Sequence, residues 1–192
     1  YAQSRSPVLI CGEIGTEMEL FAQAIHNNSL YKNGPYITVN CFGISDEMQT
    51  EIIFGSRNEK SSDNNEGALA AANHGTLLIS EIDKLSLNSQ YRLYRAIRYK
   101  SLIRNDIEKT ISIDVRIIAT TTKKLSVLVQ QGQFREDLYY LLSGLTIDVE
   151  PLRNRPEDLE YLLDMYIKLY CDMYSRYHVL TSGARKILME YP

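Results

Sequence analysis

Short apolar runs alternate with longer segments of helical periodicity along the 192 residues of this chain. Apolar or β-branched runs bounded by turn residues are typical of buried strands, whereas apolar positions three and four apart are typical of helices. The pattern predicts strands at Pro7–Cys11, Gly34–Cys41, Gly75–Ser80, Ile113–Thr122 and Leu145–Glu150. Because helical segments separate these strands, we expect an α/β fold, with helices on both faces of a parallel five-stranded sheet.

Helical patterns fill the gaps between strands and the end of the chain. Within the sheet region the predicted helices and their apolar positions are Thr16–Asn28 with Leu20, Phe21, Ala24 and Ile25, and Leu87–Tyr99 with Tyr91, Tyr94, Ala96 and Ile97. After Pro151 the pattern is helical only, and acids in the first turn open a helix at Pro156. Its predicted buried stripe is Leu159, Leu162, Leu163, Tyr166, Ile167, Tyr170 and Met173, and Ser182–Glu190 follows as a second helix.

These patterns divide the chain into two parts. We predict an α/β subdomain over residues 1–152 and the beginning of a helical subdomain over residues 153–192. The polar stretch from Gly55 to Glu66 lacks apolar anchors and is interpreted as a mobile surface loop. The chain starts without a methionine, and we expect it to be one module of a longer polypeptide.

Composition and charge narrow the function classes. A formal net charge of −3 argues against a dedicated nucleic-acid surface within these residues. No apolar run approaches the roughly 20 residues that cross a bilayer, and no signal peptide is recognisable, so we expect no membrane contact. The three scattered cysteines are expected to be reduced thiols of a cytoplasmic protein. The three histidines share no ligand spacing with them, so no metal site is predicted.

The most informative stretch is "CGEIGTEMEL", from Cys11 to Leu20, where a glycine-containing turn leads from a strand into a helix. A full phosphate-binding loop has the pattern G-x-x-x-x-G-K-[ST], in which backbone N–H groups and the lysine hold phosphates. Gly12 fits this pattern, but Glu17 replaces the second glycine and Met18 replaces the lysine. Ligands of parallel sheets bind beyond the carboxyl ends of the strands, where this turn lies.

Several blocks occur in one order: "VLICGEIGTEMEL", "AIHNNS", "GPYITVNC", "GTLLISEID", "IDVRIIATTT", "FREDLYYLL" and "PLRNRPEDL". Together they resemble the AAA+ domain of bacterial enhancer-binding proteins, the activators of sigma-54 RNA polymerase. The resemblance runs from about Ser6 to Pro192 and is greatest to activators of the dihydroxyacetone-utilisation type. It implies a P-loop NTPase-like parallel sheet followed by a helical lid, usually in a hexameric ring with ATP between neighbours.

The resemblance also assigns roles to single positions. The family loop has the sequence G-E-S-G-T-G-K-E, which is matched at Gly12, Glu13, Gly15, Thr16 and Glu19 and not at Ile14, Glu17 and Met18. Ser80 stands where the family has its Mg²⁺-binding aspartate, and Glu81 keeps the place of the water-polarising glutamate. Asn40 matches the asparagine that positions that glutamate. Thr122 replaces the γ-phosphate sensor, and Arg135 keeps one of two arginines offered to a neighbouring subunit's ATP.

The replacements weaken nucleotide binding on simple electrostatic grounds. Loss of a charge-assisted contact from lysine costs roughly 1.5–3 kcal/mol. A like-charge pair at about 4 Å costs about 4 kcal/mol at an effective dielectric near 20, so Glu17 repels a bound phosphate. Half of that, added to the missing lysine, weakens binding by about two orders of magnitude. The sigma-54-contacting G-A-F-T-G-A motif is also missing after Phe54-Gly55.

Three hypotheses follow for function. The leading one is a central AAA+-type domain of a transcriptional regulator that does not hydrolyse ATP, binds no cofactor firmly and acts by assembly or signal relay. Such a domain self-associates as a ring or dimer, affects RNA polymerase or a sigma factor indirectly, and reaches DNA through a domain outside this chain. The alternatives are a divergent but active ATPase that relies on Glu81, and a nucleotide-sensing module that binds ATP or ADP without turnover.

Overall fold

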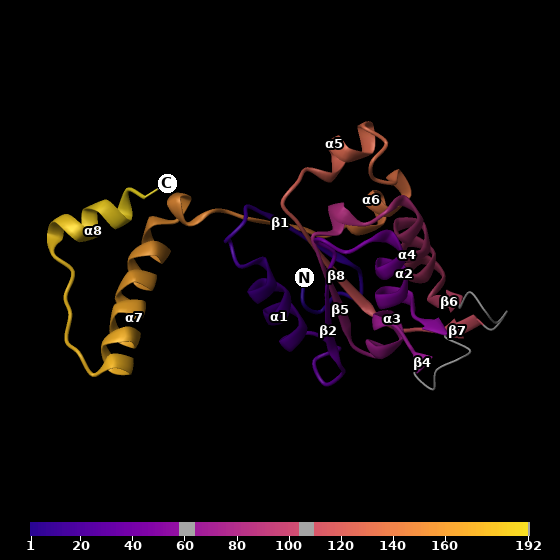
Figure 1. The fold of residues 1–192 in the computed structure, drawn as a ribbon, viewed down its shortest axis with the longest axis horizontal. Coiled ribbons are helices and arrows are strands. Elements are labelled where there is room, and N and C mark those ends of the chain that lie inside the picture. Colours follow the sequence, from indigo (N-terminus) through magenta and orange to yellow (C-terminus); the bar gives the residue numbers. More distant parts are fainter. Residues whose placement is uncertain (58–63, 104–109, 192) are drawn as a thin grey trace. The chain divides into compact units, whose positions relative to one another are not determined.

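The sheet of this protein has five parallel strands in the order β2-β5-β8-β1-β9 (Figure 1). The computed structural model describes residues 1–57, 64–103 and 110–191. The strands are β1 (Val8–Gly12), β2 (Tyr36–Asn40), β5 (Thr76–Ser80), β8 (Arg116–Thr121) and β9 (Thr146–Val149). Four of them lie within the segments predicted from the sequence, and β1 extends one residue beyond its predicted segment, to Gly12. Their parallel pairing confirms the predicted α/β class.

Helices cover both faces of the sheet, as predicted. The helices of this part are α1 (Met18–Asn27), α2 (Asp46–Phe54), α3 (Ala68–Ala71), α4 (Leu87–Tyr99), α5 (Leu125–Gln130) and α6 (Glu136–Leu142), with the 3-10 turn η1 (Ile82–Lys84). Figure 1 shows α1 on one side of the strands and α2, α3 and α4 on the other. The two faces of β5 and β8 are therefore both covered, and every residue of these two strands is buried.

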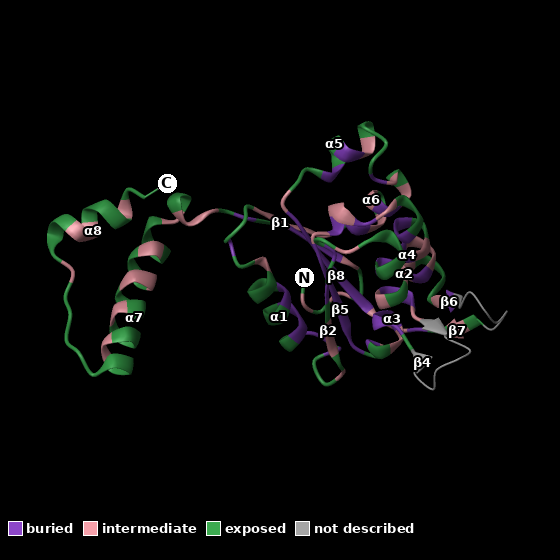
Figure 2. Ribbon diagram, viewed as in Figure 1, coloured by how far each residue is buried: buried purple, intermediate pink, exposed green. Residues whose placement is uncertain are grey.

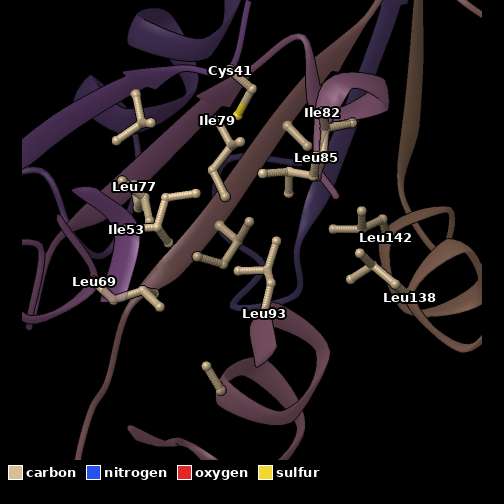
Figure 3. Close-up of a cluster of buried hydrophobic side chains, with 14 of the residues drawn as sticks. Cys41, Ile53, Leu69, Leu77, Ile79, Ile82, Leu85, Leu93, Leu138 and Leu142 are labelled. Carbon is tan, nitrogen blue, oxygen red and sulfur yellow. The ribbon is translucent and has the colours of Figure 1, made fainter. Parts of the chain in front are cut away.

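The core consists of two clusters, one on each face. Alternation along β5 sends Leu77 and Ile79 into the larger cluster and Leu78 into the smaller one. In the larger cluster (Figure 3) these side chains meet residues from α2, α3, α4 and α6, among them Ile53, Leu69, Leu93, Leu138 and Leu142. The smaller cluster joins α1 to the opposite face through Ala22 and Ile25.

The face of α1 that contacts the sheet differs from the predicted stripe. Leu20, Phe21 and Ala24 are exposed, whereas the buried residues are Ala22, Ile25 and His26. This buried face of α1 contacts β1, β5 and β8. The smaller side chain of Ala22, rather than the larger Leu20 and Phe21, therefore faces the sheet.

On α4 the predicted core-facing residues Tyr94, Ala96 and Ile97 do pack against the larger cluster, whereas Tyr91 does not. Ala96 is 2% exposed and Tyr91 is 42% exposed, while the buried positions include Leu93 and Gln90. The Gln90 side chain is buried because its amide N–H groups donate to the carbonyls of Leu85 and Gln133. A polar residue with all its bonds made inside can occupy a core position that a hydrophobic pattern assigns to its neighbours.

Two short antiparallel ribbons complete this part of the chain. Strand β3 (Ser56–Arg57) pairs with β4 (Asn64–Asn65), and β6 (Ser101–Ile103) pairs with β7 (Thr110–Ser112). The first ribbon lies in the stretch from Gly55 to Glu66 that the sequence assigned wholly to a loop, so that assignment is wrong at both ends. The middle of that stretch, residues 58–63, lies outside the described residues.

The chain separates into two compact units, Tyr1–Val149 and Glu150–Pro192. The second unit contains the turn η2 (Leu152–Asn154) and the helices α7 (Pro156–Tyr174) and α8 (Ser182–Met189). The predicted buried stripe on α7 is wrong, because α7 has no buried residue and Tyr170 and Met173 are 52% and 61% exposed (Figure 2). Within this unit two helices are too few to enclose the stripe. None of the described helices combines the length and apolarity needed to cross a membrane.

Candidate functional site

The turn after β1 is closed by its own backbone. The Thr16 hydroxyl and N–H both donate to the Glu13 carbonyl, at 2.8 and 3.2 Å. A Cβ on Gly12 would lie 2.6 Å from Thr16 Oγ1 and 3.2 Å from the Val149 carbonyl oxygen, so only glycine fits there. Gly15 has a φ of +88°, a conformation that favours glycine. Both glycines predicted in the loop are therefore required by its geometry.

Glu17 occupies a backbone conformation that glycine would adopt without strain. Its φ and ψ are 58° and 40°, in the left-handed region, and it is the N-cap residue of α1. The Glu17 side chain makes no capping hydrogen bond, although its carbonyl accepts the Leu20 N–H at 2.9 Å. This is the position where the phosphate-loop pattern has its second glycine, so the turn keeps the backbone shape of that pattern while carrying a carboxylate.

The first turn of α1 is joined to the end of β5 through side chains. The Ser80 hydroxyl donates to Glu19 Oε1 at 2.7 Å, although the two residues are 61 positions apart in the sequence. Ser80 is buried, and Glu19 is exposed at its helical position. Burial, together with the Glu19 carboxylate, raises the pKa of the neighbouring Tyr36 to about 12. The negative charge of Glu19 therefore lies beside the carboxyl edge of the sheet and is held there by a neutral hydroxyl.

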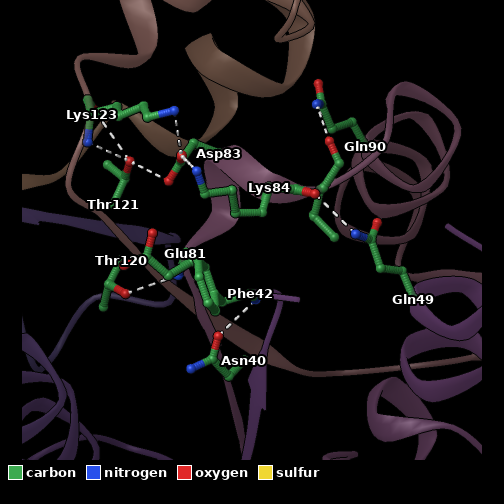
Figure 4. Close-up of polar contacts among 11 residues, drawn as sticks. Asn40, Phe42, Gln49, Glu81, Asp83, Lys84, Gln90, Thr120, Thr121 and Lys123 are labelled. Atoms are coloured by element: carbon green, nitrogen blue, oxygen red, sulfur yellow. Dashed lines mark hydrogen bonds and ion pairs between the residues drawn. The ribbon is translucent and has the colours of Figure 1, made fainter. Parts of the chain in front are cut away.

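The ends of β2 and β5 place two further predicted residues side by side. Asn40 is in register with Ser80, and Glu81 follows directly. Asn40 Oδ1 accepts the Phe42 N–H at 2.8 Å (Figure 4), and no hydrogen bond joins it to Glu81 within the part of the chain that the structure describes. Glu81 has a φ of 55°, and its N–H donates to Thr120 Oγ1 at 3.4 Å. The roles assigned to Asn40 and Glu81 by the family resemblance stay predictions.

A buried acid that sequence reasoning missed lies at the same edge. The Asp83 side chain is fully buried, accepts a hydrogen bond from Thr121 Oγ1 at 3.0 Å, and lies 3.5 and 3.7 Å from the ammonium groups of Lys84 and Lys123 (Figure 4). This pairing fixes the chain that leaves β8, where Thr122 is half-buried. The available signal was an acid shortly after one strand and lysines shortly after its neighbour, both at carboxyl ends of parallel strands.

Arg135 is held by its own helix. Its Nε and Nη2 donate to Asp137 Oδ1 and Oδ2 at 3.0 and 2.8 Å, and its guanidinium lies 5.0 Å from the Tyr91 ring centroid. The hydrogen bond to Arg135 lowers the pKa of the Asp137 carboxyl. The backbone N–H of Arg135 donates to Gln90 Oε1 at 2.8 Å, which anchors the start of α6 to α4. Reaching a neighbouring subunit would require Arg135 to leave Asp137.

Two of the three cysteines, Cys11 and Cys41, lie near this edge of the sheet. Cys11, Cys41 and Cys171 are all free. Burial is the main cause that raises the pKa of Cys11 to about 11 and that of Cys41 to about 12, with nearby carboxylates adding to it. Both thiols are therefore protonated at neutral pH and contribute packing rather than nucleophilic chemistry. Among the described residues no three His, Cys, Asp or Glu side chains gather as metal ligands.

The fold and the loop together match one protein family. The pattern of the family described as "Sigma-54 interaction domain" matches residues 1–148 of this chain. The chain belongs to the Sigma-54 interaction domain family. The predicted resemblance to sigma-54 activators is thereby confirmed, while the dihydroxyacetone-utilisation subtype stays a prediction.

Relatives of the family extend beyond this chain in length. The Sigma54-dependent transcriptional activator SfnR of Pseudomonas putida is 40% identical over 198 residues, which cover 99% of this chain and 53% of SfnR. The Regulatory protein AtoC of Escherichia coli (strain K12) is 38% identical over 174 residues, covering 88% of this chain and 37% of AtoC. The chain thus spans about half the length, or less, of these relatives.

Solved structures show the same fold. The crystal structure of NtrX from Brucella abortus in complex with ADP superposes with a TM-score of 0.90 at 30% identity, over 99% of this chain and 42% of NtrX. NtrX in complex with ATP gives a TM-score of 0.88. The P-loop NTPase domain of an E. coli sigma-54 activator, at 19% identity and a TM-score of 0.54, supports the fold alone. The AAA+ P-loop NTPase fold predicted from the sequence is therefore confirmed.

Proposed function

We propose that this chain is a central AAA+ domain of a bacterial transcriptional regulator whose nucleotide site does not hydrolyse ATP. The observation that carries this proposal is the hydrogen bond from Ser80 to Glu19 in the first turn of α1, because Ser80 stands where the family resemblance places the Mg²⁺-binding aspartate. A neutral hydroxyl committed to a carboxylate is a poor ligand for Mg²⁺, which favours carboxylate oxygens.

The charges around the loop support the same proposal. Residues Glu13–Glu19 contain three carboxylates and no lysine or arginine. Glu81 adds a fourth acid at the neighbouring strand end. A triphosphate brought to this edge meets repulsion where the phosphate-loop pattern supplies a lysine, and the phosphoryl-transfer transition state lacks its electrostatic stabilisation. The residues present therefore do not fit a bound Mg·ATP.

We further propose that the domain acts by assembly within a longer protein. The chain spans 53% of SfnR, so a sensory or DNA-contacting segment would lie outside residues 1–192. The partners that this proposal implies are further copies of the chain, in a ring or dimer, and RNA polymerase or a sigma factor, on which the effect is indirect. Direct contact with sigma-54 is not included, because the sequence after Phe54-Gly55 lacks the family's contact motif.

Phosphate release by the full-length protein in Mg·ATP tests the proposal. We expect no release above a buffer control, and no difference between the natural protein and the Glu81→Gln variant. Release that the Glu81→Gln change abolishes would contradict the proposal, because it would show that Glu81 polarises an attacking water. The divergent-ATPase alternative would then be the correct function.

A second candidate function is binding of ADP or ATP without turnover. It is favoured by the backbone of the loop, which keeps Gly12, Gly15 and the left-handed conformation at Glu17, and by the ADP and ATP complexes of NtrX, which is 30% identical. Isothermal titration with ADP separates the two candidates. A dissociation constant of about 100 μM or tighter would support nucleotide binding without turnover. No measurable binding of ADP would support a site that holds no nucleotide.

Rebuilding the loop tests why the site would be empty. The double variant Glu17→Gly with Met18→Lys restores the phosphate-loop pattern at both positions. We expect it to bind ADP at least about 100-fold more tightly than the natural chain, from the recovered lysine contact and the removed repulsion. The single change Met18→Gln, which adds no charge, is the control and should leave affinity unchanged.

A further inference from the structure

The structure contains a cationic hollow on α4, remote in sequence from the acidic loop after β1. A hollow of about 170 Å³ lies over α4, with Arg92, Arg95 and Asn88 on that helix and Ser101 at the start of β6 among its lining residues. Asn88, Arg92 and Arg95 are spaced four and three residues apart, so they share one face of α4. Donor groups from two elements therefore converge on one small space.

Arg92 is held rigidly and has unsatisfied hydrogen-bonding capacity. Its guanidinium carbon lies 4.2 Å from the centroid of the buried Phe54 ring, a stacked cation–π arrangement. Its Nη2 atom is buried and has no hydrogen-bond partner. Burial lowers the pKa of Arg92 from its ordinary value, yet a guanidinium remains charged at neutral pH. A buried charged donor without an acceptor is costly, and an anion in the hollow would relieve that cost.

Arg95 adds a second positive charge that has no ion-pair partner among the residues that the structure describes. Its guanidinium lies 5.8 Å from the Tyr91 ring centroid, and the ring is shared with Arg135 at 5.0 Å. Among the described residues, carboxylates form ion pairs with Arg135, Arg155 and Arg185 but with neither Arg92 nor Arg95. Arg92 and Arg95 therefore place two positive charges without a carboxylate partner, among the described residues, on the lining of one hollow.

We propose that this hollow, lined by Asn88, Arg92, Arg95 and Ser101, is a binding site for a phosphate group. Two planar guanidinium groups, an amide and a hydroxyl offer donors from several directions, which suits a tetrahedral oxyanion better than a planar carboxylate or a spherical halide. The aromatic faces of Phe54 and Tyr91 keep the guanidinium planes in place, so little side-chain entropy is lost on binding. This site is independent of the loop after β1 and of whether that loop binds nucleotide.

The test is a titration of the 192-residue chain with inorganic phosphate, followed by NMR of the arginine Nε–H groups and of the backbone. Sodium chloride and sodium acetate at equal ionic strength are the comparison ligands. We expect saturable shifts of the Arg92 and Arg95 Nε–H signals with phosphate, and only weak, unsaturated shifts with chloride and acetate. The melting temperature should rise with phosphate in parallel.

Three single variants make the test specific. Arg95→Gln and Arg92→Gln should each weaken phosphate binding about 10-fold or more, which corresponds to one charge-assisted hydrogen bond. Arg95→Gln leaves the stack on Phe54 intact, so it remains informative if Arg92→Gln fails to fold. Arg98→Gln is the matched control, since Arg98 is an exposed arginine on the same helix outside the hollow, and it should keep full affinity.

Several outcomes would overturn the proposal. If Arg98→Gln weakened phosphate binding as much as Arg92→Gln and Arg95→Gln do, the loss would reflect the change in net charge and not a specific site. Equal binding of acetate would exclude a preference for a tetrahedral oxyanion. Saturable phosphate shifts confined to the backbone of Glu13–Glu19, with Arg92 and Arg95 unmoved, would place the anion in the loop after β1 instead.

Discussion

Single residues decide how the loop after β1 departs from a phosphate loop. Glu17 keeps the left-handed backbone of the missing glycine and replaces a neutral position by an acid. The conformation costs a non-glycine residue about 1–2 kcal/mol, so the loop shape is imposed by its surroundings rather than by Glu17 itself. Gly12 and Gly15 supply those surroundings through close approach and a positive φ.

The strain at Glu17 makes a stability prediction. Replacing Glu17 by glycine should raise the free energy of unfolding by about 0.5–1 kcal/mol, because relief of the left-handed strain exceeds the entropy that glycine adds to the unfolded chain. Urea unfolding measures the change. The control is Gln23→Gly at an exposed interior position of α1, which should lower stability by about 1 kcal/mol. A loss at both positions would show that Glu17 is not strained.

A buried histidine gives the protein a pH dependence. His26 is 5% exposed, its Nδ1 lies 2.9 Å from Thr76 Oγ1, and burial followed by the charge of Arg116 lowers its pKa below the ordinary 6.5. As the pH falls below about 6.5, the unfolded chain binds a proton at His26 before the folded chain does, so stability decreases. We expect this part of the acid destabilisation to vanish in His26→Gln and to persist in His178→Gln, an exposed histidine of the second unit. Unfolding free energies measured at about pH 7.5 and 5.5 decide it.

At the scale of elements, long-range side-chain bonds fix how helices and turns sit on the sheet. Ser80 and Glu19 join β5 to α1, Asp83 with Lys123 joins η1 to the segment after β8, and Arg135 joins α6 to α4 through Gln90. Each bond connects the carboxyl edge of the sheet, or a helix near it, to a distant part of the sequence. These bonds therefore shape the candidate site more than the loop sequence alone.

The bond between Ser80 and Glu19 is measurable as a coupling. A double-mutant cycle of Ser80→Ala and Glu19→Gln should give a coupling energy of about 0.5–1 kcal/mol, reduced from that of a buried charged bond because Glu19 is exposed. Pairing Ser80→Ala with Glu17→Gln is the control and should give no coupling. Equal coupling in both cycles would mean that only local charge, and not the bond, is being measured.

The orientation of α4 also has a direct test. Leu93 is fully buried in the larger cluster, so Leu93→Ala should lower stability by about 2–5 kcal/mol. Leu87→Ala on the same helix removes a side chain that is 50% exposed and should change stability by less than about 0.5 kcal/mol. Thermal and urea unfolding measure both changes. Equal losses of unfolding free energy in the two variants would contradict the described orientation of α4.

At the scale of the whole molecule, the two units differ in how they are stabilised. The unit Tyr1–Val149 has a sheet covered on both faces by buried apolar side chains. The unit Glu150–Pro192 consists of η2, α7 and α8, and neither helix has a buried residue. Most of the folding free energy should therefore come from the first unit, since burial of apolar area is its main source.

This difference predicts that the first unit folds by itself. A chain ending at Val149 should keep a cooperative thermal transition, because β9 completes the sheet beside β1. A chain ending at Ser143 lacks β9 and exposes the β1 edge, so it should lose cooperativity or aggregate. Calorimetry of both chains tests the prediction. Loss of cooperativity in both would show that the second unit is required for the first to fold.

The sequence by itself determined the fold class, the positions of all five strands to within about a residue, and which charged residues the loop after β1 carries. The periodicity of apolar residues marks the strands, and the loop's charge is the sum of its own side chains. Both are therefore local properties of the sequence. The tertiary structure alone decided which face of α1 is buried, that Gln90 rather than Tyr91 is buried on α4, that Ser80 bonds to Glu19 across 61 positions, and that Asp83 is buried between lysines. These depend on strand order and helix crossing, which bring distant residues together and which no local pattern encodes.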